Sequence, residues 1–244
     1  MLETAITAAR AAGALLKAGF GQDVQVNREY LHDLKIQADE DAQAVIFETI
    51  RQAYPDHKLI GEEGNCGNPD GETEWIVDPL DGTMNFAHHI PHFCTSIAVR
   101  RSGKYLAAVI YDPIREELYT ASETEPTKLN GREVRVSPRA GLGEAVMGVG
   151  FAKSQASIEY CLELYRHYGH RARKLRAMGS AALDMAYVAA GRLDAYIEQG
   201  VNLWDVAAGV LLVEQAGGEI DMLEREDGSI KIAATSGNIE YPLT

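Results

Sequence analysis

Trp75-Ile76-Val77-Asp78-Pro79-Leu80-Asp81-Gly82-Thr83 joins an apolar strand directly to two carboxylates, a glycine and a hydroxyl. The apolar run is typical of a buried strand, and α/β proteins bind ligands at the edge where such strands end. Asp78 and Asp81 would repel each other there, since two like charges about 4 Å apart cost roughly 4 kcal/mol at an effective dielectric constant of ~20. A cation or a shared proton would offset this repulsion. Oxygen ligands at this density favour magnesium or a similar hard cation.

Two further acidic clusters follow short apolar strands. Residues 58–61 lead into Glu62-Glu63, and residues 194–198 lead through a glycine to Trp204-Asp205. We expect a carboxylate to follow the end of each of these strands. Three such acidic clusters in one chain predict that they share a metal site. Asp205 also opens an apolar helix pattern over residues 206–214, where the helix dipole favours a negative charge. A helix cap is therefore the alternative for this residue.

Taken together, these residues resemble the inositol monophosphatase family of magnesium-dependent, lithium-sensitive sugar phosphatases. The first family signature, an apolar strand followed by Asp-Pro-Ile/Leu-Asp-Gly-Thr and Asn-Phe, corresponds to residues 75–86. The second, Trp-Asp followed by a small-residue helix that ends Glu-Ala-Gly-Gly, corresponds to residues 204–218. A Gly-Glu-Glu element matches residues 61–63, and a small-residue turn matches residues 179–182. The resemblance runs in order from Asp33 to about Ser236.

The expected fold class is α+β. Helical patterns over residues 2–20 and 39–54 precede a mostly antiparallel strand region, in which Asn130-Gly131 is a strong hairpin signal. Strands and helices alternate after about Pro138. We therefore expect a metal- and phosphate-binding α+β subdomain over residues 1–137. An alternating α/β subdomain over residues 138–244 would contribute the last metal ligand and the substrate contacts. The resemblance implies a layered α-β-α-β-α sandwich.

Composition restricts the partners and the compartment. The formal net charge of −13 argues against nucleic acid and anionic membranes as partners. Cys66, Cys94 and Cys161 lack CxxC spacing, which indicates free thiols in a reducing compartment. The N-terminal stretch lacks the apolar core of a signal peptide, and no run approaches the ~20 apolar residues of a membrane span. We expect a cytoplasmic homodimer that acts on a small phosphorylated polyol or sugar.

The resemblance implies a set of Mg²⁺ ligands. Glu62, Asp78 and the backbone carbonyl of Leu80 would bind the first ion. Asp78, Asp81 and Asp205 would bind the second, so that Asp78 bridges the two ions. Glu62 would also bind a third, weaker ion.

Hydrolysis of a phosphate monoester requires a strong nucleophile, because it is among the slowest uncatalysed reactions. The chain shows no evident covalent nucleophile in a phosphate loop, and metal-activated water is the natural substitute. By resemblance, Glu62 belongs to the catalytic set, and the Thr83 hydroxyl orients the water with Asp39 as its partner. A helix N-cap is the alternative for Asp39.

Substrate contacts are expected at two turns and one strand. The amides of Gly82, Thr83 and Met84 open a predicted helix turn that would favour phosphate oxygens. By resemblance, the substrate-binding residues are Asp81, Gly82, Thr83, Gly179, Ser180, Ala181 and Glu198. Glu198 is the best clue to the alcohol, with a solvated strand end as its alternative. Arg176 matches a family arginine beside the second turn, or is an ordinary salt-bridge partner.

Other conspicuous side chains have weaker interpretations. His88, His89 and His92 suggest zinc, but Pro91 disrupts a helical i, i+4 arrangement and the family has only the first of the three. Cys66 follows Glu62 closely and is either reactive or an inert exposed thiol. We expect Glu63 to support the metal site without binding the ion.

The chain departs from the family just before Asp39. A threonine-rich approach is replaced by Lys35-Ile36-Gln37-Ala38, and Arg28 stands where the family has a lysine. We expect these changes to alter the affinity for the third metal ion. The predicted function is magnesium-dependent hydrolysis of inositol monophosphate. The alternatives are a fructose 1,6-bisphosphatase, a histidinol-phosphate phosphatase, a 3′-phosphonucleotide phosphatase, or an inactive metal-binding scaffold.

Overall fold

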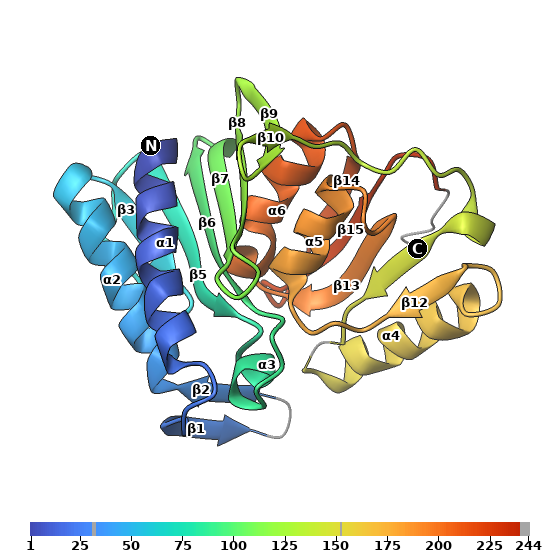
Figure 1. Ribbon diagram of the computed structural model, residues 1–244, viewed down its shortest axis with the longest axis horizontal. Helices are drawn as coiled ribbons and strands as arrows, with labels where there is room; N and C mark the ends of the chain where they lie inside the picture. The colour runs from blue at the N-terminus through green and yellow to red at the C-terminus, as the bar shows by residue number, and fades with distance from the viewer. Residues whose placement is uncertain (31–32, 152, 240–244) are drawn as a thin grey trace.

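The computed structural model describes residues 1–30, 33–151 and 153–239 (Figure 1). The helices are α1 (Leu2–Gly19), α2 (Gln37–Ala53), α3 (Thr83–Ala87), α4 (Gln155–Tyr168), α5 (Ala181–Ala189) and α6 (Leu203–Gln215), with a 3-10 helix, η1 (Leu142–Glu144). The first strands are β1 (Val26–Tyr30), β2 (Asp33–Ile36), β3 (Lys58–Gly61), β4 (Cys66–Gly67), β5 (Thr73–Asp81), β6 (Cys94–Arg101) and β7 (Lys104–Asp112). The remaining strands are β8 (Glu117–Ser122), β9 (Glu125–Leu129), β10 (Arg132–Glu133), β11 (Val146–Val149), β12 (Lys174–Arg176), β13 (Ala195–Val201), β14 (Glu219–Glu224) and β15 (Ile230–Thr235).

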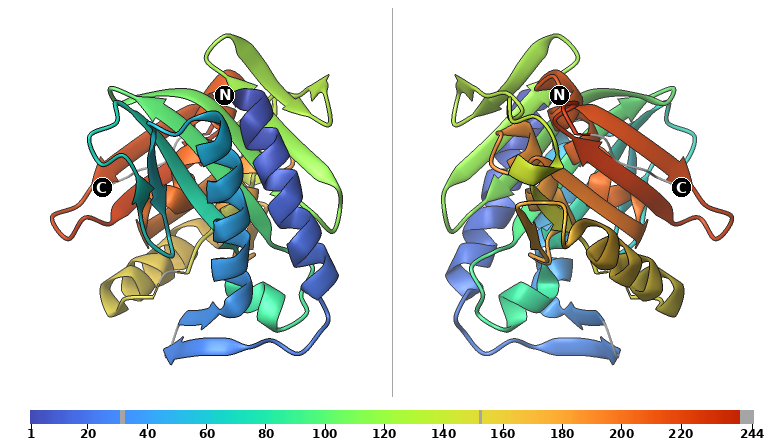
Figure 2. Two further views of the ribbon diagram at one scale, coloured as in Figure 1. Left: turned by 90° about the vertical axis from the view of Figure 1, so that its left-hand side faces the viewer. Right: turned by 90° about the vertical axis from the view of Figure 1, so that its right-hand side faces the viewer.

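The helices and sheets form five layers (Figures 1 and 2). Within the described ranges, eight strands form one sheet in the order β10-β9-β8-β7-β6-β5-β3-β4, and five form a second in the order β12-β11-β13-β15-β14. Helices α1 and α2 cover one face of the larger sheet, α5 and α6 lie between the sheets, and α4 packs on the far face of the smaller sheet. The expected α+β class and the layered α-β-α-β-α sandwich are confirmed.

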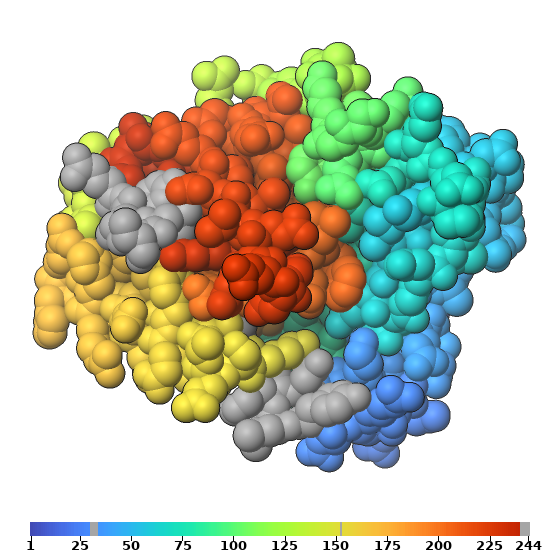
Figure 3. All heavy atoms as spheres, turned by 180° about the vertical axis from the view of Figure 1, so that it is seen from behind, coloured from blue at the N-terminus to red at the C-terminus, as the bar shows by residue number. Residues whose placement is uncertain are grey.

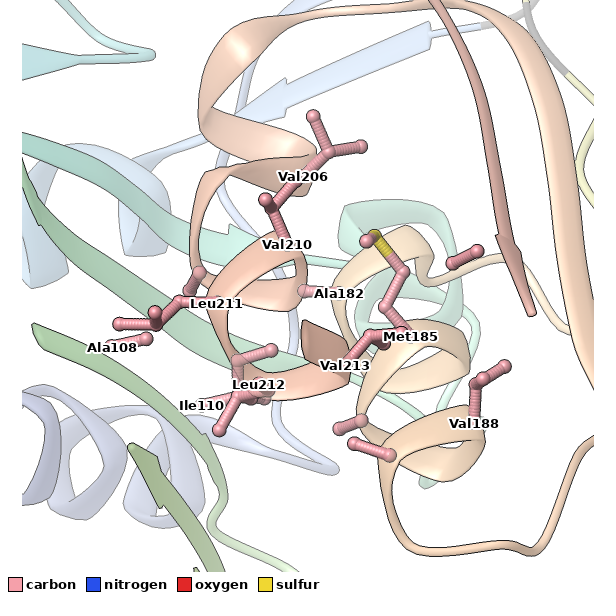
Figure 4. Close-up of a cluster of buried hydrophobic side chains, with 14 of the residues drawn as sticks. Ala108, Ile110, Ala182, Met185, Val188, Val206, Val210, Leu211, Leu212 and Val213 are labelled. Carbon is pink, nitrogen blue, oxygen red and sulfur yellow. The ribbon is translucent and has the colours of Figure 1, made fainter. Parts of the chain in front are cut away.

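The central layer carries the most apolar helices. Residues 206–213 of α6 are all buried, because a helix that is apolar on every side is stable only inside a core. In Figure 4, Ala108 and Ile110 of β7 lie beside Leu211 and Leu212 of α6. Helices α5 and α6 approach so closely that a Cβ on Gly209 would lie 2.6 Å from Met185 Cβ. This packing fixes the starting points of both helices relative to the larger sheet.

Two parallel strands bring their carboxyl ends to one edge of the larger sheet. Strands β3 and β5 pair in parallel, with Gly61 opposite Val77, so that Glu62 follows β3 beside the end of β5. The register of β5 against β6 shifts between Asp78 and Asp81. Both aspartates therefore belong to the irregular end of the strand, whereas the sequence pattern placed them after it. A bulge of this kind redirects side chains at the end of a strand.

The predicted boundary at Ser137-Pro138 separates the strands of the larger sheet from those of the smaller sheet. Seen from behind, the blue-to-green half and the yellow-to-red half of the chain lie side by side (Figure 3). The division into two subdomains stays a prediction, since the core around α5 and α6 takes side chains from both halves.

Local turn signals were informative. Asn130 and Gly131 have φ values of 48° and 79°, as a tight hairpin between β9 and β10 requires, and that prediction is confirmed. Helix α2 begins at Gln37, earlier than the pattern indicated, which puts Asp39 in its first turn.

Within the described ranges, none of the helices combines the length and the apolarity needed to cross a bilayer.

Candidate active site

A pocket of about 370 Å³ opens where the ends of β3, β5 and β13 meet the first turns of α3, α5 and α6. Its wall brings together residues that are far apart in the sequence. All the predicted metal ligands line it: Glu62, Asp78, Leu80, Asp81 and Asp205. The other predicted substrate residues line it as well: Gly82, Thr83, Gly179, Ser180, Ala181 and Glu198.

The aspartates of β5 are held by hydrogen bonds that fix their orientation. Asp81 Oδ2 accepts from the Ser180 hydroxyl at 2.5 Å and from the Ala182 amide at 2.7 Å. Asp78 Oδ1 accepts from the Leu80 amide at 3.1 Å. The bonds to Asp81 tie the end of β5 to the start of α5, which joins the two halves of the chain at the pocket.

Asp205 stabilises the start of α6 and also lines the pocket, while its role as a metal ligand stays a prediction. Its Oδ2 accepts from the Asn202 amide at 2.6 Å, which caps the first turn of α6, and its side chain lines the pocket. A carboxylate at this point is favoured by the helix dipole and by the unpaired amides of the first turn. The apolar burial of α6 therefore holds a negative charge at the pocket wall.

The carboxylates of the pocket oppose one another electrostatically. Burial raises the pKa of Asp78 well above its ordinary value, and the charges of Glu62 and Asp81 raise it further. Burial also raises the pKa of Asp81, against the hydrogen bonds from Ser180 and Ala182. The pKa of Asp205 is raised by burial in the same way. A cation between these groups would offset the repulsion between them.

The donor set fits a hard divalent cation, because carboxylate and carbonyl oxygens are the ligands that Mg²⁺ prefers. In the described residues, however, no three His, Cys, Asp or Glu side chains converge closely enough to enclose an ion. The Leu80 carbonyl, an expected ligand, accepts a hydrogen bond from the Thr83 hydroxyl at 3.0 Å.

Asp39 contacts the pocket through Thr83. The single hydrogen of the Thr83 hydroxyl is shared between the Leu80 carbonyl oxygen, at 3.0 Å, and Asp39 Oδ1, at 3.2 Å. Asp39 Oδ2 accepts from the Ile36 amide at 3.1 Å. The N-cap of α2 is Ile36, so the N-cap alternative for Asp39 is wrong: Asp39 is the third residue of the helix and accepts from the N-cap amide. Its other oxygen contacts Thr83, the partner that the resemblance implied. Burial and the charge of Glu62 raise its pKa to about 8.

Two glycine turns frame the predicted phosphate and alcohol positions. Gly82 has a φ of 97° before α3, and a Cβ there would lie 2.9 Å from the His92 carbonyl oxygen. Gly179 has a φ of 82°, and a Cβ there would lie 3.1 Å from Asn85 Nδ2. Asn85 also donates to the Met178 carbonyl at 2.9 Å. These contacts hold the two turns together and require glycine at both.

Glu198 lies in the middle of β13 and not at the end of a strand, which corrects the sequence-based placement. It is partly buried and accepts a hydrogen bond from the Tyr196 hydroxyl, so a solvated strand end does not describe it. Burial raises its pKa to about 7, while the hydrogen bond from Tyr196 and the charge of Lys153 act in the opposite direction.

Sequence reasoning missed three residues of the pocket wall. Lys153 is the one cationic side chain among the described lining residues, and Phe151 is 52% exposed beside it. Asp184 is 1% exposed and lies 3.8 Å from His92 Nε2. An acid inside the small-residue pattern of α5 was a signal for Asp184. The pattern around Lys153 and Phe151 contained no such signal.

Several candidates lie outside the pocket wall. Arg176 is exposed at the end of β12 and donates to the Leu175 carbonyl. Cys66 is an exposed thiol 3.8 Å from an Arg51 nitrogen. Glu63 pairs with Lys35. The three histidines of residues 88–92 form no metal-binding group with other described residues, so the zinc alternative has no support.

Comparison with known proteins agrees with this geometry. The sequence matches the family model of the inositol monophosphatase family over residues 1–239. It is 43% identical over 223 residues to the inositol-1-monophosphatase of Rhizobium meliloti, covering 89% of this chain and 84% of that protein. It is 42% identical over 222 residues to the Nus factor SuhB of Pasteurella multocida, and the match covers 89% of this chain and 83% of that protein. The crystal structure of the extragenic suppressor protein suhB from Bartonella henselae superposes with a TM-score of 0.88 at 37% sequence identity. The superposition covers 96% of this chain and 93% of that chain.

Proposed function

The chain belongs to the inositol monophosphatase family, a family of phosphatases, and from this premise we propose that it is a magnesium-dependent phosphomonoesterase that hydrolyses inositol monophosphate. The observation that carries the proposal is the meeting of four acids, the Asp39–Thr83 pair and Glu198 around one pocket. The acids supply a cation site, the pair can orient water, and the glutamate can bind an alcohol.

The oxygen donors divide into two overlapping sets. Glu62, Asp78 and the Leu80 carbonyl would hold one Mg²⁺, and Asp78, Asp81 and Asp205 a second, with a weaker third ion at Glu62. When bound, such ions lower the pKa of a coordinated water and offset the charge of the phosphoryl oxygens. We expect inhibition by lithium, because a small monovalent ion could replace one Mg²⁺ at these carboxylates.

Thr83 and Asp39 are proposed to orient the attacking water. The hydrogen of the Thr83 hydroxyl is directed toward Asp39 Oδ1 and the Leu80 carbonyl, so the hydroxyl oxygen can accept a hydrogen bond from water on its pocket side. Its position at the start of α3 places it beside the amides of Gly82 and Met84, which would donate to phosphate oxygens. Water and phosphate would thus be held by neighbouring groups of one rigid turn.

The leaving alcohol would be recognised at the other side of the pocket. Glu198 can accept hydrogen bonds from ring hydroxyls, and the turn over residues 179–181 faces the same space. A carboxylate that binds hydroxyls discriminates strongly against analogues that lack them, because its oxygens would be left without donors. This reasoning favours a polyol such as inositol.

Phosphate release from a panel of substrates tests the proposal. The panel contains inositol 1-phosphate, fructose 1,6-bisphosphate, histidinol phosphate, a 3′-phosphonucleotide and an aryl phosphate, each with and without Mg²⁺. We expect the highest kcat/KM for inositol 1-phosphate and no turnover in chelator. If another compound in the panel is hydrolysed with a higher kcat/KM, that compound is the better substrate assignment. If none of the compounds is hydrolysed, the result supports the alternative of an inactive metal-binding scaffold.

The remaining expectations concern assembly and partners. Some similar proteins are named Nus factors, but the net charge of −13 argues against direct binding of nucleic acid by this chain. We propose a cytoplasmic homodimer without nucleic-acid or membrane partners. Sedimentation and a binding assay with RNA would test these points separately from turnover.

A further inference from the structure

Lys35 places a positive charge against Glu62, which lines the pocket, and against the neighbouring Glu63. Its Nζ lies 3.7 Å from Glu62 Oε1 and forms a closer ion pair with Glu63. The side chain of Lys35 is 29% exposed, against 18% for Glu62 and 11% for Glu63. This lysine is therefore partly shielded from water, where the interaction between charges is stronger than on an open surface.

The local structure fixes this placement. Successive side chains of a strand point to opposite faces, and Leu34 and Ile36 of β2 pack into the core beneath α1 and α2. Lys35 consequently projects from the other face of β2. Helix α2 begins immediately after this strand, so the same segment also fixes Asp39.

Lys35 and a metal ion at Glu62 would repel each other. Glu62 is the first carboxylate of the proposed metal set, and its charge is partly balanced by Lys35 before any ion arrives. A cation that binds there must tolerate the ammonium group or displace it toward Glu63. By the family resemblance, a threonine-rich approach would precede Asp39, and the present chain has Lys35-Ile36-Gln37-Ala38 there instead.

We propose that Lys35 is an internal counter-cation that competes with divalent metal ions for Glu62. When a metal ion binds at Glu62, Glu63 retains Lys35 through their ion pair. The inference rests on the proposed function only in placing a metal ion at Glu62. It assigns Lys35 a role in setting metal affinity, and not in the chemical step. The weak third site, which depends on Glu62, is where its effect is largest.

Binding of Mn²⁺, followed by the electron paramagnetic resonance signal of the free ion, measures affinity without turnover. We expect Lys35→Met to tighten the weakest site by roughly fivefold or more, the low end of typical coupling between two sites. Lys35→Arg keeps the charge and should bind Mn²⁺ like the wild type. Lys58→Met is the matched control. Lys58 is similarly exposed, at 32%, and it lies at the start of β3, away from Glu62, where it pairs with Glu74 of β5.

A second pair of variants tests the part assigned to Glu63. Glu63→Gln releases Lys35 toward Glu62 and should weaken Mn²⁺ binding. In the Lys35→Met background the same substitution should have no further effect, because no ammonium group remains to be held. An equal loss of affinity in both backgrounds would show that Glu63 attracts the ion directly and would overturn this part.

Stability gives a readout that a purely structural lysine would not produce. In chelator, Lys35→Met should lower the melting temperature, because Glu62 and Glu63 lose their counter-charge. Saturating Mn²⁺ should restore it to the wild-type value, since ion binding stabilises the folded state by mass action. A loss independent of Mn²⁺, or unchanged affinity in Lys35→Met, overturns the inference alone. Failure of the wild type to bind Mn²⁺ overturns it together with the proposed function.

Discussion

Gly150 and Glu198 approach each other so closely that a Cβ on Gly150 would lie 1.7 Å from Glu198 Oε2. Gly150 directly follows β11 and Glu198 lies in the middle of β13, and these two strands pair in parallel. The glycine therefore provides the space in which the carboxylate meets the Tyr196 hydroxyl. This arrangement links the substrate contact proposed for Glu198 to a residue that carries no functional group.

Gly150→Ala should displace Glu198 without unfolding the protein, because the end of a glutamate side chain can turn away at small cost. We expect kcat/KM for inositol 1-phosphate to fall roughly tenfold to hundredfold, as for a misplaced substrate contact. Steady-state kinetics together with thermal unfolding measure the two effects. Gly143→Ala is the control, since a Cβ there meets nothing within 4 Å. Equal losses in the two variants would refute the proposed link.

Glu198→Gln tests substrate recognition directly. We expect kcat/KM for inositol 1-phosphate to fall by about 1.5–3 kcal/mol, the range for a hydrogen bond to a charged group. Turnover of an aryl phosphate should hardly change, because it offers no ring hydroxyls to this carboxylate. Parallel kinetics on both substrates measure the difference. An equal loss on the two would assign Glu198 a supporting role in the structure.

The raised pKa of Glu198 predicts a pH dependence of stability in chelator. Burial moves this pKa from its ordinary value of 4.5 to about 7, so the folded state binds more protons than the unfolded state between these values. The free energy of unfolding should therefore decrease as pH rises through this window. Other buried acids share this sign, so the comparison is with Glu198→Gln. Urea unfolding at pH 5 and pH 7.5 should show a shallower decrease for the variant, and parallel decreases would contradict the assignment.

Asp78→Asn should abolish Mg²⁺-dependent phosphate release and leave the fold intact. The substitution removes the carboxylate proposed to bridge two ions, and it also removes a buried charge that Glu62 and Asp81 oppose. Stability in chelator should therefore hold or rise. Phosphate-release assays and urea unfolding measure the two results. Near-wild-type turnover at saturating Mg²⁺ would show that Asp78 is not a shared ligand.

Thr83→Ala and Asp39→Asn should each lower kcat by roughly a hundredfold, since they break the same hydrogen-bonded pair beside the proposed water. Residues that act as one unit have non-additive effects, so the double variant should lose no more than either single variant. Binding of Mn²⁺ should change little in all three. Single-turnover kinetics test this prediction, and multiplicative losses would separate the two residues.

Much of the site was accessible from the sequence because it follows local rules. Asp78, Asp81 and Glu62 come at the ends of apolar strands, and Asp205 comes at the start of an apolar helix. Patterns of this kind depend on neighbouring residues alone. The same holds for the hairpin at Asn130-Gly131 and for the order of helices and strands, which predicted the fold class.

Other parts were decided by contacts between distant segments. The sequence placed Glu198 at a strand end, but pairing of β13 with β15 carries the strand past it to Val201. Asp184 comes into the pocket because α5 is packed between the sheets. Lys153 reaches it from the chain before α4. The local hydrophobic pattern around these residues does not predict that their side chains will line the pocket.

By itself, therefore, the sequence determined the acidic composition of the site and the α+β class, because each depends on patterns within single strands and helices. Its motifs carried the resemblance to the family, and that resemblance implied the layered arrangement. Only the tertiary structure decided which charges meet. Lys35 lies 3.7 Å from Glu62 because burial of Ile36 in the core fixes the position of β2, and Glu198 has space because the residue that faces it, Gly150, is a glycine. Such pairings arise from packing between elements, and their energies depend on burial that no local pattern specifies.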